Sequence, residues 1–258
     1  MGESNRKSHY SSPSWLTKGE GVIKPDFTGE RLSVRNAIIC YDDNFYPKLI
    51  SVFGRKGSRE APGFNGSHEG RIIGDVAIFR AYPGAPASGM MMEEAIAAGA
   101  ENILMLGLAG SISPKVRMGD LVIPTWAIRE EGLSYHYLRP EVVPRPSPKL
   151  LGRLRSALEG VPHHEAGVWT TDAVFREVPS KLRRYAKAGA LVVEMECSAL
   201  MAIAKYRKVE FAALMTITDE TFGREWRPGF DKDVVMRAWL VACEAAKRTF
   251  SAGRGGRG

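Results

Sequence analysis

The chain has 258 residues, of which 44% are hydrophobic and 25% charged, and its formal net charge is +7. This length and composition suit one large α/β domain with a substantial core. No apolar run approaches the roughly 18 residues that a membrane-spanning helix needs, so the sequence predicts no transmembrane helix and no membrane partner.

The chain ends and the cysteines indicate the compartment and exclude a metal site. Residues 1–33 are polar and lack an apolar signal core, so we expect a flexible arm and no secretion. Residues 251–258 form a Gly/Arg tail that we expect to be disordered. The positive charge is compatible with weak nucleic-acid affinity or with an anionic substrate, and we expect no nucleic-acid partner. Cys40, Cys197 and Cys243 lack metal-ligand spacing, which predicts reduced thiols in a cytoplasmic protein and no metal.

Between these ends, residues 34–250 have the pattern of a single domain in which strands alternate with helices. The alternation predicts a largely parallel sheet covered by helices on both faces, with ligands bound beyond the carboxyl ends of strands. In chain order we predict strands at 36–40 and 76–79, a helix at 88–98, strands at 103–106 and 121–124, a proline-rich loop at 139–148, a helix at 149–158, a strand at 168–171, a helix at 180–187 capped by Ser180, a strand at 191–193, a helix at 196–206, a strand at 211–218 and a closing helix at 231–249.

A glycine-rich segment follows the predicted central strand. It reads Gly107-Leu108-Ala109-Gly110-Ser111. Glycines there let backbone N–H groups approach a ligand closely, so the segment can cradle an anion or a sugar. A tight turn into the next element explains the same residues equally well.

Acidic residues stand at two further strand ends. Glu194 and Glu196 flank Met195 where a strand meets a helix, and a carboxylate there can accept hydrogen bonds from the vicinal hydroxyls of a ribose or cap the helix. Asp219 directly follows the predicted strand 211–218. A carboxyl group shielded from water has a raised pKa and can donate a proton, whereas a solvated turn aspartate has neither property.

Together these segments resemble the purine and uridine phosphorylase family, which includes the methylthioadenosine-type nucleosidases. The resemblance covers most of the chain, from about 36 to 249, and VEME at 193–196 is its most specific motif. The motifs in order are GAPAS at 84–88, GLAGS at 107–111, VRMGDLVIP at 116–124, GLSYHY at 132–137, TTDAVFRE at 170–177, VEME at 193–196 and ITD at 217–219.

The resemblance implies a three-layer α/β/α fold with a mixed, partly barrel-like central sheet, and a homodimer or homohexamer. It implies a nucleoside substrate, phosphate as co-substrate and no cofactor. It also implies three groups of site residues, besides Asp219, which would protonate the leaving base. These are Glu196, Met195 and Glu194 for the ribose; Thr171, Val174 and Phe175 for the base; and Gly107, Leu108, Gly110, Ser111, Arg59, Asp42 and Asp43 around the nucleophile, with Arg59 supplied by a neighbouring subunit.

The sequence departs from the family pattern where phosphate is expected. Phe45 and Met105 stand in the places of two arginines, and Leu108 replaces a hydroxyl residue. Asp42 and Asp43 stand about where the hydrolytic members place a carboxylate that activates water.

The base pocket also departs from the pattern. Val174 replaces a phenylalanine, with Phe175 adjacent, and the chain contains no Gln with which to read uracil.

These features lead to ranked alternatives. We expect a phosphorylase that acts on a purine nucleoside in salvage. A phosphate-independent purine or methylthioadenosine-type nucleosidase and a uridine phosphorylase are the alternatives, followed by a non-catalytic nucleoside-binding homologue. His9 or His68 could reach a neighbouring subunit's pocket, although a surface position explains each histidine more simply.

Overall fold

The computed structural model describes residues 16, 19–25, 29, 31–223 and 225–251. Much of the predicted arm, 1–33, and all of the predicted tail except Ser251 lie outside these residues. The end of the arm contacts the domain, because the backbone N–H of Leu32 donates to the carbonyl of Ala98 at 2.9 Å.

The strands in the described part of the chain form one mixed sheet in the order β10-β9-β6-β7-β8-β5-β1-β4-β3-β2. Because β5 also pairs with β9, the strands β5, β9, β6, β7 and β8 close on themselves. The predicted mixed, partly barrel-like sheet is therefore confirmed. The strands are β1 (Asn36–Cys40), β2 (Arg59–Glu60), β3 (Ser67–Ile73), β4 (Val76–Ala81), β5 (Asn102–Ser111), β6 (Leu121–Glu130), β7 (His164–Thr171), β8 (Ala190–Glu194), β9 (Glu210–Glu220) and β10 (Arg227–Pro228).

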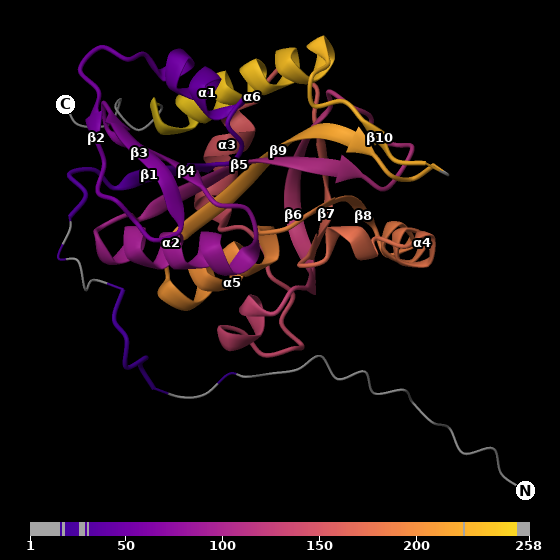
Figure 1. The fold of residues 1–258 in the computed structure, drawn as a ribbon, viewed down its shortest axis with the longest axis horizontal. Helices are drawn as coiled ribbons and strands as arrows, with labels where there is room; N and C mark the ends of the chain where they lie inside the picture. Colours follow the sequence, from indigo (N-terminus) through magenta and orange to yellow (C-terminus); the bar gives the residue numbers. More distant parts are fainter. Residues whose placement is uncertain (1–15, 17–18, 26–28, 30, 224, 252–258) are drawn as a thin grey trace, which may run out of the picture.

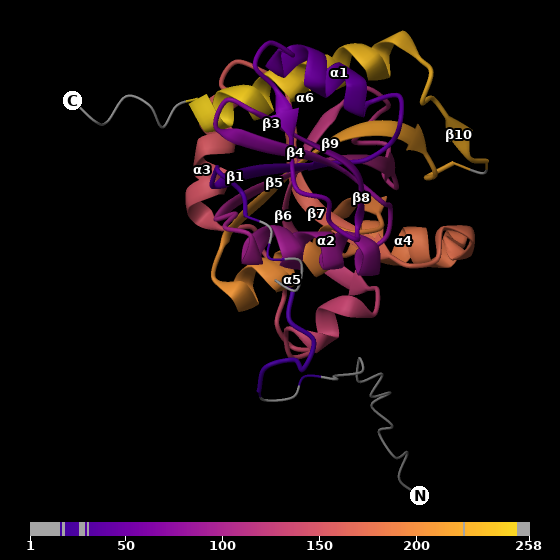
Figure 2. The same cartoon turned by 60° about the vertical axis from the view of Figure 1, so that its left-hand side comes forward.

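Helices cover both faces of this sheet, which confirms the predicted three layers. Helices α1, α3 and α6 pack together on one face, and α2 and α5 pack together on the other, with α4 beside β8 (Figures 1 and 2). The helices are α1 (Tyr46–Phe53), α2 (Ala85–Ala97), α3 (Pro148–Ala157), α4 (Pro179–Lys187), α5 (Cys197–Arg207) and α6 (Asp233–Ser251), with short 3-10 helices η1 (Leu133–His136) and η2 (Val174–Arg176).

The alternation of side chains along β5 builds both halves of the core. Ile103 and Met105 belong to the apolar cluster with α2 and α5, whereas Leu104 and Leu106 belong to the cluster with α1, α3 and α6. Successive side chains of a strand point to opposite faces, so a strand covered on both sides is apolar throughout. This explains why the run 103–106 was recognisable in the sequence.

The predicted strands and the closing helix are present, but three details of the sequence interpretation are wrong. Residues Gly107 to Ser111 form no turn, because β5 continues through Ser111 in register with β9. Ser180 is not a helix cap, since α4 begins at Pro179 after Val178. Asp219 lies within β9 and not beyond it.

The longer elements that escaped the sequence interpretation are β3 and α1; the short β2, β10, η1 and η2 were not predicted either. Strand β3 is the antiparallel neighbour of β4 and carries polar residues at most of its first positions, so it lacks a continuous apolar run. Helix α1 is short, and eight residues of mixed apolar character do not distinguish a helix from a strand. Separately, no helix in the described ranges combines the length and apolarity needed to cross a membrane.

Candidate active site

The candidate site lies where two strand ends meet over the middle of β5. Strand β1 pairs in parallel with β5 as far as Leu106, and β8 pairs with it antiparallel at Gly110 and Ser111. The carboxyl ends of β1 and β8 therefore face each other across the stretch 107–109. Ligands of open α/β folds bind at such interruptions of strand order.

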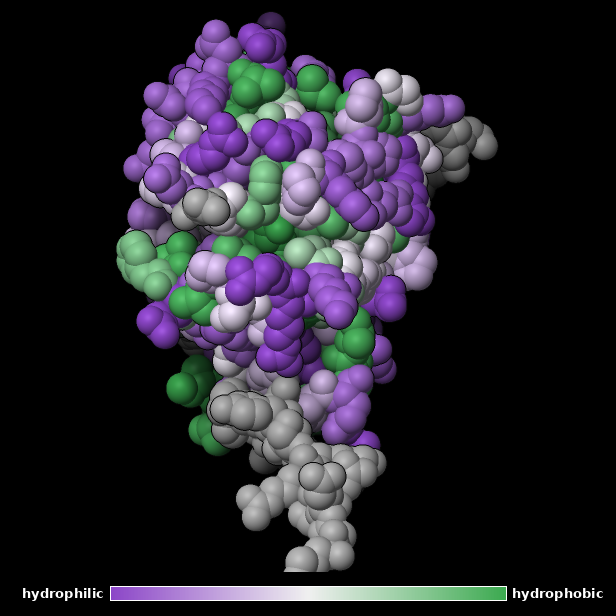
Figure 3. Space-filling model, turned by 90° about the vertical axis from the view of Figure 1, so that its right-hand side faces the viewer, coloured by the Kyte–Doolittle hydropathy of each residue, from purple (hydrophilic) through white to green (hydrophobic). Residues whose placement is uncertain are grey.

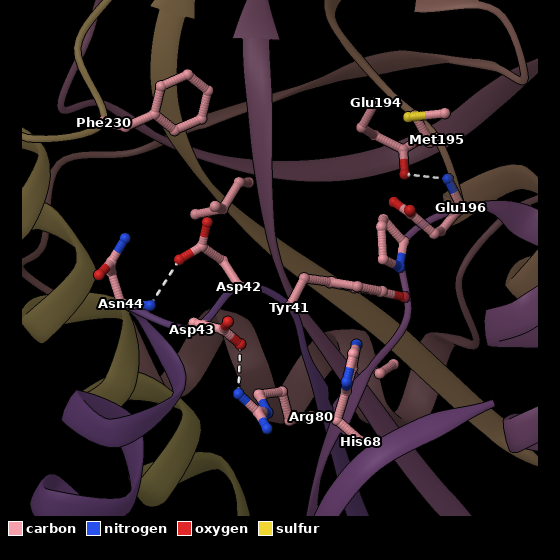
Figure 4. A pocket seen from close by; sticks show the side chains of 13 residues that line it. Tyr41, Asp42, Asp43, Asn44, His68, Arg80, Glu194, Met195, Glu196 and Phe230 are labelled. Atoms are coloured by element: carbon pink, nitrogen blue, oxygen red, sulfur yellow. Dashed lines mark hydrogen bonds and ion pairs between the residues drawn. The ribbon is translucent and has the colours of Figure 1, made fainter. Parts of the chain in front are cut away.

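A cavity of about 560 Å³ opens at this junction. Figure 4 shows Glu194, Met195 and Glu196 on one side and Asp43 and Arg80 on the other. The volume suits a ligand of nucleoside size. The wall comprises Tyr41, Asp42, Asp43, Asn44, His68, Arg80, Ala81, Pro83, Leu108, Glu194, Met195, Glu196 and Phe230.

Glu194 is the helix cap that the sequence left as one of two interpretations. Its Oε2 accepts hydrogen bonds from the backbone N–H groups of Glu196 and Cys197, both at 2.7 Å, and its Oε1 accepts one from the Thr170 hydroxyl at 2.5 Å. These donors occupy both carboxylate oxygens at the start of α5. Glu194 therefore holds the strand-to-helix junction in place.

Glu196 lies on the cavity wall and is held by the turn before α2. Its Oε1 accepts a hydrogen bond from the backbone N–H of Gly84 at 2.5 Å, and the Met195 backbone and the Glu194 side chain also form hydrogen bonds with its carboxyl group. Gly84 has a φ of 98°, in the left-handed region that favours glycine. Glu196 is thus held by the turn before α2 at the wall of the cavity.

Burial acts on both carboxyl groups. It raises the pKa of Glu194 and of Glu196 above the ordinary value for glutamate, and the donors around Glu194 oppose the shift. Two negative charges held this close are costly in a dry site. Hydroxyl donors on a bound sugar would stabilise the Glu196 carboxylate.

Asp219 is brought to its position by an irregularity in β9. The pairing of β5 with β9 shifts register between Ala109 and Gly110, so that Gly110 lies opposite Asp219. A bulge of this kind re-aims a side chain. A Cβ added at Gly110 would lie 2.8 Å from Asp219 Oδ2, so the glycine leaves room for the carboxyl group.

The carboxyl group of Asp219 is buried and partnered. It accepts hydrogen bonds from the Thr218 hydroxyl at 2.9 Å and from the Trp226 indole N–H at 2.8 Å. Burial raises its pKa, and these two donors oppose the shift. Asp219 is absent from the cavity wall. Its partner Trp226 lies tilted beside Phe230, which does line the cavity, with 6.5 Å between the ring centroids.

The loop after β1 brings the two predicted aspartates to the cavity. Asp42 has a φ of 74° and its Oδ1 accepts a hydrogen bond from the backbone N–H of Asn44 at 2.7 Å, which stabilises a local turn. Asp43 forms an ion pair with Arg80. Both aspartates therefore already have partners at the cavity.

The two residues that replace expected arginines belong to the core. Phe45 is fully buried, edge-on to Trp239 with 5.1 Å between the ring centroids, and Met105 is buried under α2 and α5. Neither lines the cavity. These two apolar side chains therefore stabilise the core and do not contact a ligand in the cavity.

The remaining residues predicted around the nucleophile divide into two groups. Leu108 lines the cavity, whereas Gly107, Gly110 and Ser111 do not, and the Ser111 hydroxyl donates to the carbonyls of Ser113 and Val116. Arg59 lies on β2, is hydrogen-bonded to Ser33 and does not line the cavity of its own chain.

The predicted base-binding residues lie outside this cavity wall. Thr171 ends β7, is buried and accepts a hydrogen bond from the backbone N–H of Ala173 at 3.2 Å. Val174 is exposed, and 96% of Phe175 is accessible. The face that carries α4 and β10 shows apolar areas between hydrophilic ones (Figure 3). The assignment of this segment to the base therefore stays a prediction.

Several residues of the cavity were missed in the sequence interpretation. Arg80 follows the apolar strand run 76–79, so a charged residue directly after a buried strand was the signal that could have identified it. Tyr41 and Phe230 carried no comparable signal. Among the described residues, no group of His, Cys, Asp and Glu has the arrangement of a metal site.

Comparisons with known proteins identify the family. Residues 37–250 match the family model described as Phosphorylase superfamily. The chain is 28% identical over 162 residues to a guanosine phosphorylase of Halorubrum lacusprofundi, covering 62% of this chain and 66% of that protein. It is also 28% identical over 186 residues to a uridine phosphorylase of Treponema pallidum, covering 67% and 72% respectively.

A solved structure has the same fold. The purine nucleoside phosphorylase of Toxoplasma gondii, in complex with immucillin-H, superposes with a TM-score of 0.77 at 18% identity, covering 93% of this chain and 99% of that one. The family match extends over nearly all of the domain that contains the cavity. The chain therefore belongs to the phosphorylase superfamily, and it is an enzyme of the nucleoside phosphorylase family.

Proposed function

We propose that the protein cleaves the N-glycosidic bond of a purine ribonucleoside with phosphate, giving the free base and ribose 1-phosphate in nucleoside salvage. The observation that carries this proposal is the buried Glu196 carboxylate on the wall of a nucleoside-sized cavity, with one oxygen bonded to Gly84. A carboxylate in this setting suits the vicinal hydroxyls of a ribose, with Met195 beside it on the wall.

The chemistry requires stabilisation at both ends of the breaking bond. A phosphate oxygen forms a bond to C1′ while the bond from C1′ to the base nitrogen breaks and its electron pair moves to the base. Positive charge develops on the ribose, next to Glu196, and negative charge on the base. Asp219, whose pKa is raised by burial, supplies a proton or a hydrogen bond to the purine.

The choice of purine rests on Asp219 and on the absence of Gln from the sequence. An acidic group suits protonation of purine N7, whereas uracil offers amide-like groups that a Gln side chain would read. The matched relatives include enzymes named for guanosine and for uridine. In this proposal Thr171, Val174 and Phe175 close the base pocket, and a cytoplasmic homodimer or homohexamer adds Arg59 from a neighbouring subunit.

Phosphate-independent hydrolysis is the second candidate, because Asp42 and Asp43 lie on the cavity wall. A carboxylate there can take a proton from an attacking water. The ion pair between Asp43 and Arg80 and the local turn at Asp42 favour structural roles for these aspartates. Phosphorolysis is therefore the primary proposal.

One assay distinguishes the two reactions. The protein is incubated with inosine, adenosine, methylthioadenosine and uridine, with and without phosphate, and the free base is measured. We expect release of purine base that requires phosphate and saturates with it. Release without phosphate contradicts the proposal and favours the nucleosidase, and tight binding without turnover indicates a non-catalytic homologue.

A double substitution of the aspartates provides the matched test. Asp42→Asn combined with Asp43→Asn leaves phosphorolysis intact or improved, because removing negative charge aids an incoming anion. The same change abolishes a reaction in which an aspartate activates water. The phosphate dependence of both proteins is measured over the low millimolar range.

A further inference from the structure

Arg80 brings a cation into the cavity from the side opposite the glutamates. It lies on β4, where it pairs with Cys40 of β1 and with Glu69 of β3. It is the one arginine or lysine among the residues that line this cavity in the described chain. Figure 4 shows Arg80 near His68, with Tyr41 between Arg80 and the side of the cavity that carries Glu196.

The guanidinium group of Arg80 is incompletely partnered. Its side chain is only 23% exposed. Nη1 pairs with Asp43, and Nη2 lies 4.0 Å from Glu69 Oε2. Its Nε is buried and has no hydrogen-bond partner in the described residues. A buried donor left unpaired is unfavourable and calls for an explanation, such as a bound ligand.

The acidic partners of Arg80 hold it loosely. The Asp43 side chain is 80% exposed, so solvent weakens this ion pair. Glu69 is shared, because its Oε1 also pairs with Arg71 Nε at 3.0 Å. An anion with several oxygens could therefore replace Asp43 and bind the guanidinium fork in its place.

The shape of the group favours a tetrahedral oxyanion. A guanidinium presents several N–H donors in one plane, which match two oxygens of a phosphate. The neighbouring His68 ring is exposed and lies tilted against Tyr82, with 3.6 Å between the ring centroids, which holds it at the same rim. The two residues come from adjacent strands, β3 and β4, so the sheet fixes their spacing.

We infer that Arg80, assisted by His68, forms a phosphate-binding subsite of this cavity. The inference deepens the proposed function and rests on it, since the bound group is either inorganic phosphate used as co-substrate or the phosphoryl group of a nucleotide substrate. The two sources share the same recognition chemistry. In the free protein Asp43 occupies part of the subsite and competes with the anion.

The test measures binding without turnover. Inorganic phosphate, and separately adenosine 5′-monophosphate with adenosine for comparison, are titrated calorimetrically into the full chain. Arg80→Gln is expected to weaken phosphate binding about tenfold to hundredfold, the range for loss of a charge-assisted pair. Arg35→Gln, whose exposed side chain pairs with Glu101 and lies off the cavity wall, is the control and is expected to leave phosphate binding unchanged.

Asp43→Asn should have the opposite effect on phosphate affinity to Arg80→Gln, because removal of the competing carboxylate should tighten phosphate binding severalfold. Arg80→Lys covers the case in which Arg80→Gln does not fold, and is expected to bind with intermediate affinity because charge remains while the fork is lost. Thermal unfolding of each variant verifies that the fold is retained.

The outcomes separate the two proposals. The subsite is overturned if Arg80→Gln changes neither the affinity for inorganic phosphate nor the affinity advantage of adenosine 5′-monophosphate over adenosine, or if neither phosphate compound binds to the wild type. Loss of only the nucleotide's affinity advantage over adenosine supports the subsite and identifies the substrate's phosphoryl group as the source. Phosphate binding that depends on Arg80 in a protein that cleaves no nucleoside supports the subsite but contradicts the proposed function.

Discussion

Substitution of Glu196 by Gln tests the proposed ribose site most directly. The amide keeps the shape of the carboxylate, and its oxygen can still accept the hydrogen bond from the Gly84 N–H that Glu196 Oε1 accepts at 2.5 Å. The other oxygen becomes an NH₂ group, which cannot accept a hydrogen bond from a ribose hydroxyl. The substitution therefore removes the negative charge and one acceptor oxygen while keeping the hydrogen bond to the turn before α2.

The magnitude follows from the bond that is lost. A hydrogen bond to a charged group contributes about 1.5–3 kcal/mol. Loss of that amount from the transition state lowers kcat/KM roughly 10- to 150-fold. Burial raises the pKa of Glu196, so a neutral residue at this position has a smaller desolvation penalty and the free energy of unfolding should not fall.

Glu194→Gln is the matched control, because the two glutamates lie two residues apart and have different partners. Glu194 Oε2 accepts from two backbone N–H groups, at 2.7 Å each. Its replacement should mainly lower the free energy of unfolding, by about 1–3 kcal/mol for a cap left incomplete.

The assay combines initial rates of purine release at saturating phosphate with urea unfolding of each variant. Glu196→Gln activity within twofold of the wild type would refute the ribose assignment. The assignment would also be refuted if both substitutions lowered the free energy of unfolding equally and lowered activity only in proportion to that loss of stability.

Three further changes test the region around Asp219 and the effect of pH. Asp219→Asn should lower purine nucleoside cleavage by about 10²–10⁴-fold but affect a riboside with a good leaving group much less. The wild-type rate should fall as pH rises through the burial-raised pKa of Asp219, and this fall should be absent from the variant. Equal losses on both substrates would show a structural role. Gly110→Ala would place a Cβ 2.8 Å from Asp219 Oδ2 and should lower kcat by at least about tenfold. Gly152→Ala, where a Cβ meets nothing within 4 Å, is the control and should leave kcat unchanged. Similar rates for the two variants would contradict the close approach of Gly110 to Asp219. Burial, with a smaller contribution from the Asp219 charge, raises the pKa of Glu177 to about 7 from 4.5, so the wild type should lose stability as pH rises between these values. Above pH 8 the free energy of unfolding of Glu177→Gln, measured with urea, should exceed that of the wild type by about 1 kcal/mol, a figure discounted for partial exposure. At pH 4 the variant should show no such gain.

Local sequence was sufficient to predict the fold class and two of the acidic positions. The continuous apolar runs of β5 and β9 identified strands buried on both faces, and Glu194 marked the end of β8, whereas Asp219 proved to lie within β9. The ordered motifs led to the right family, as the match over residues 37–250 shows. These features are recorded in short stretches of sequence, because side-chain alternation and helix periodicity depend on near neighbours.

Only the tertiary structure separated the roles of Glu194 and Glu196. Glu194 is the last residue of β8 and Glu196 comes two residues later, so either could have been the cap on spacing alone. The cap is Glu194 because Thr170 of β7 and the first N–H groups of α5 converge on it. Pairing of Gly110 with Asp219 likewise follows from a register shift between β5 and β9, which no local pattern encodes.

The cavity itself was decided by contacts between distant segments. Arg80 lies beside Asp43 because β4 pairs in parallel with β1, and both face Glu196 because β1 and β8 approach β5 from opposite ends. Sequence alone determined which residue types stand at the strand ends, since burial and backbone conformation act locally. Strand order and register brought those ends together, because they arise from the packing of the whole sheet between its two layers of helices.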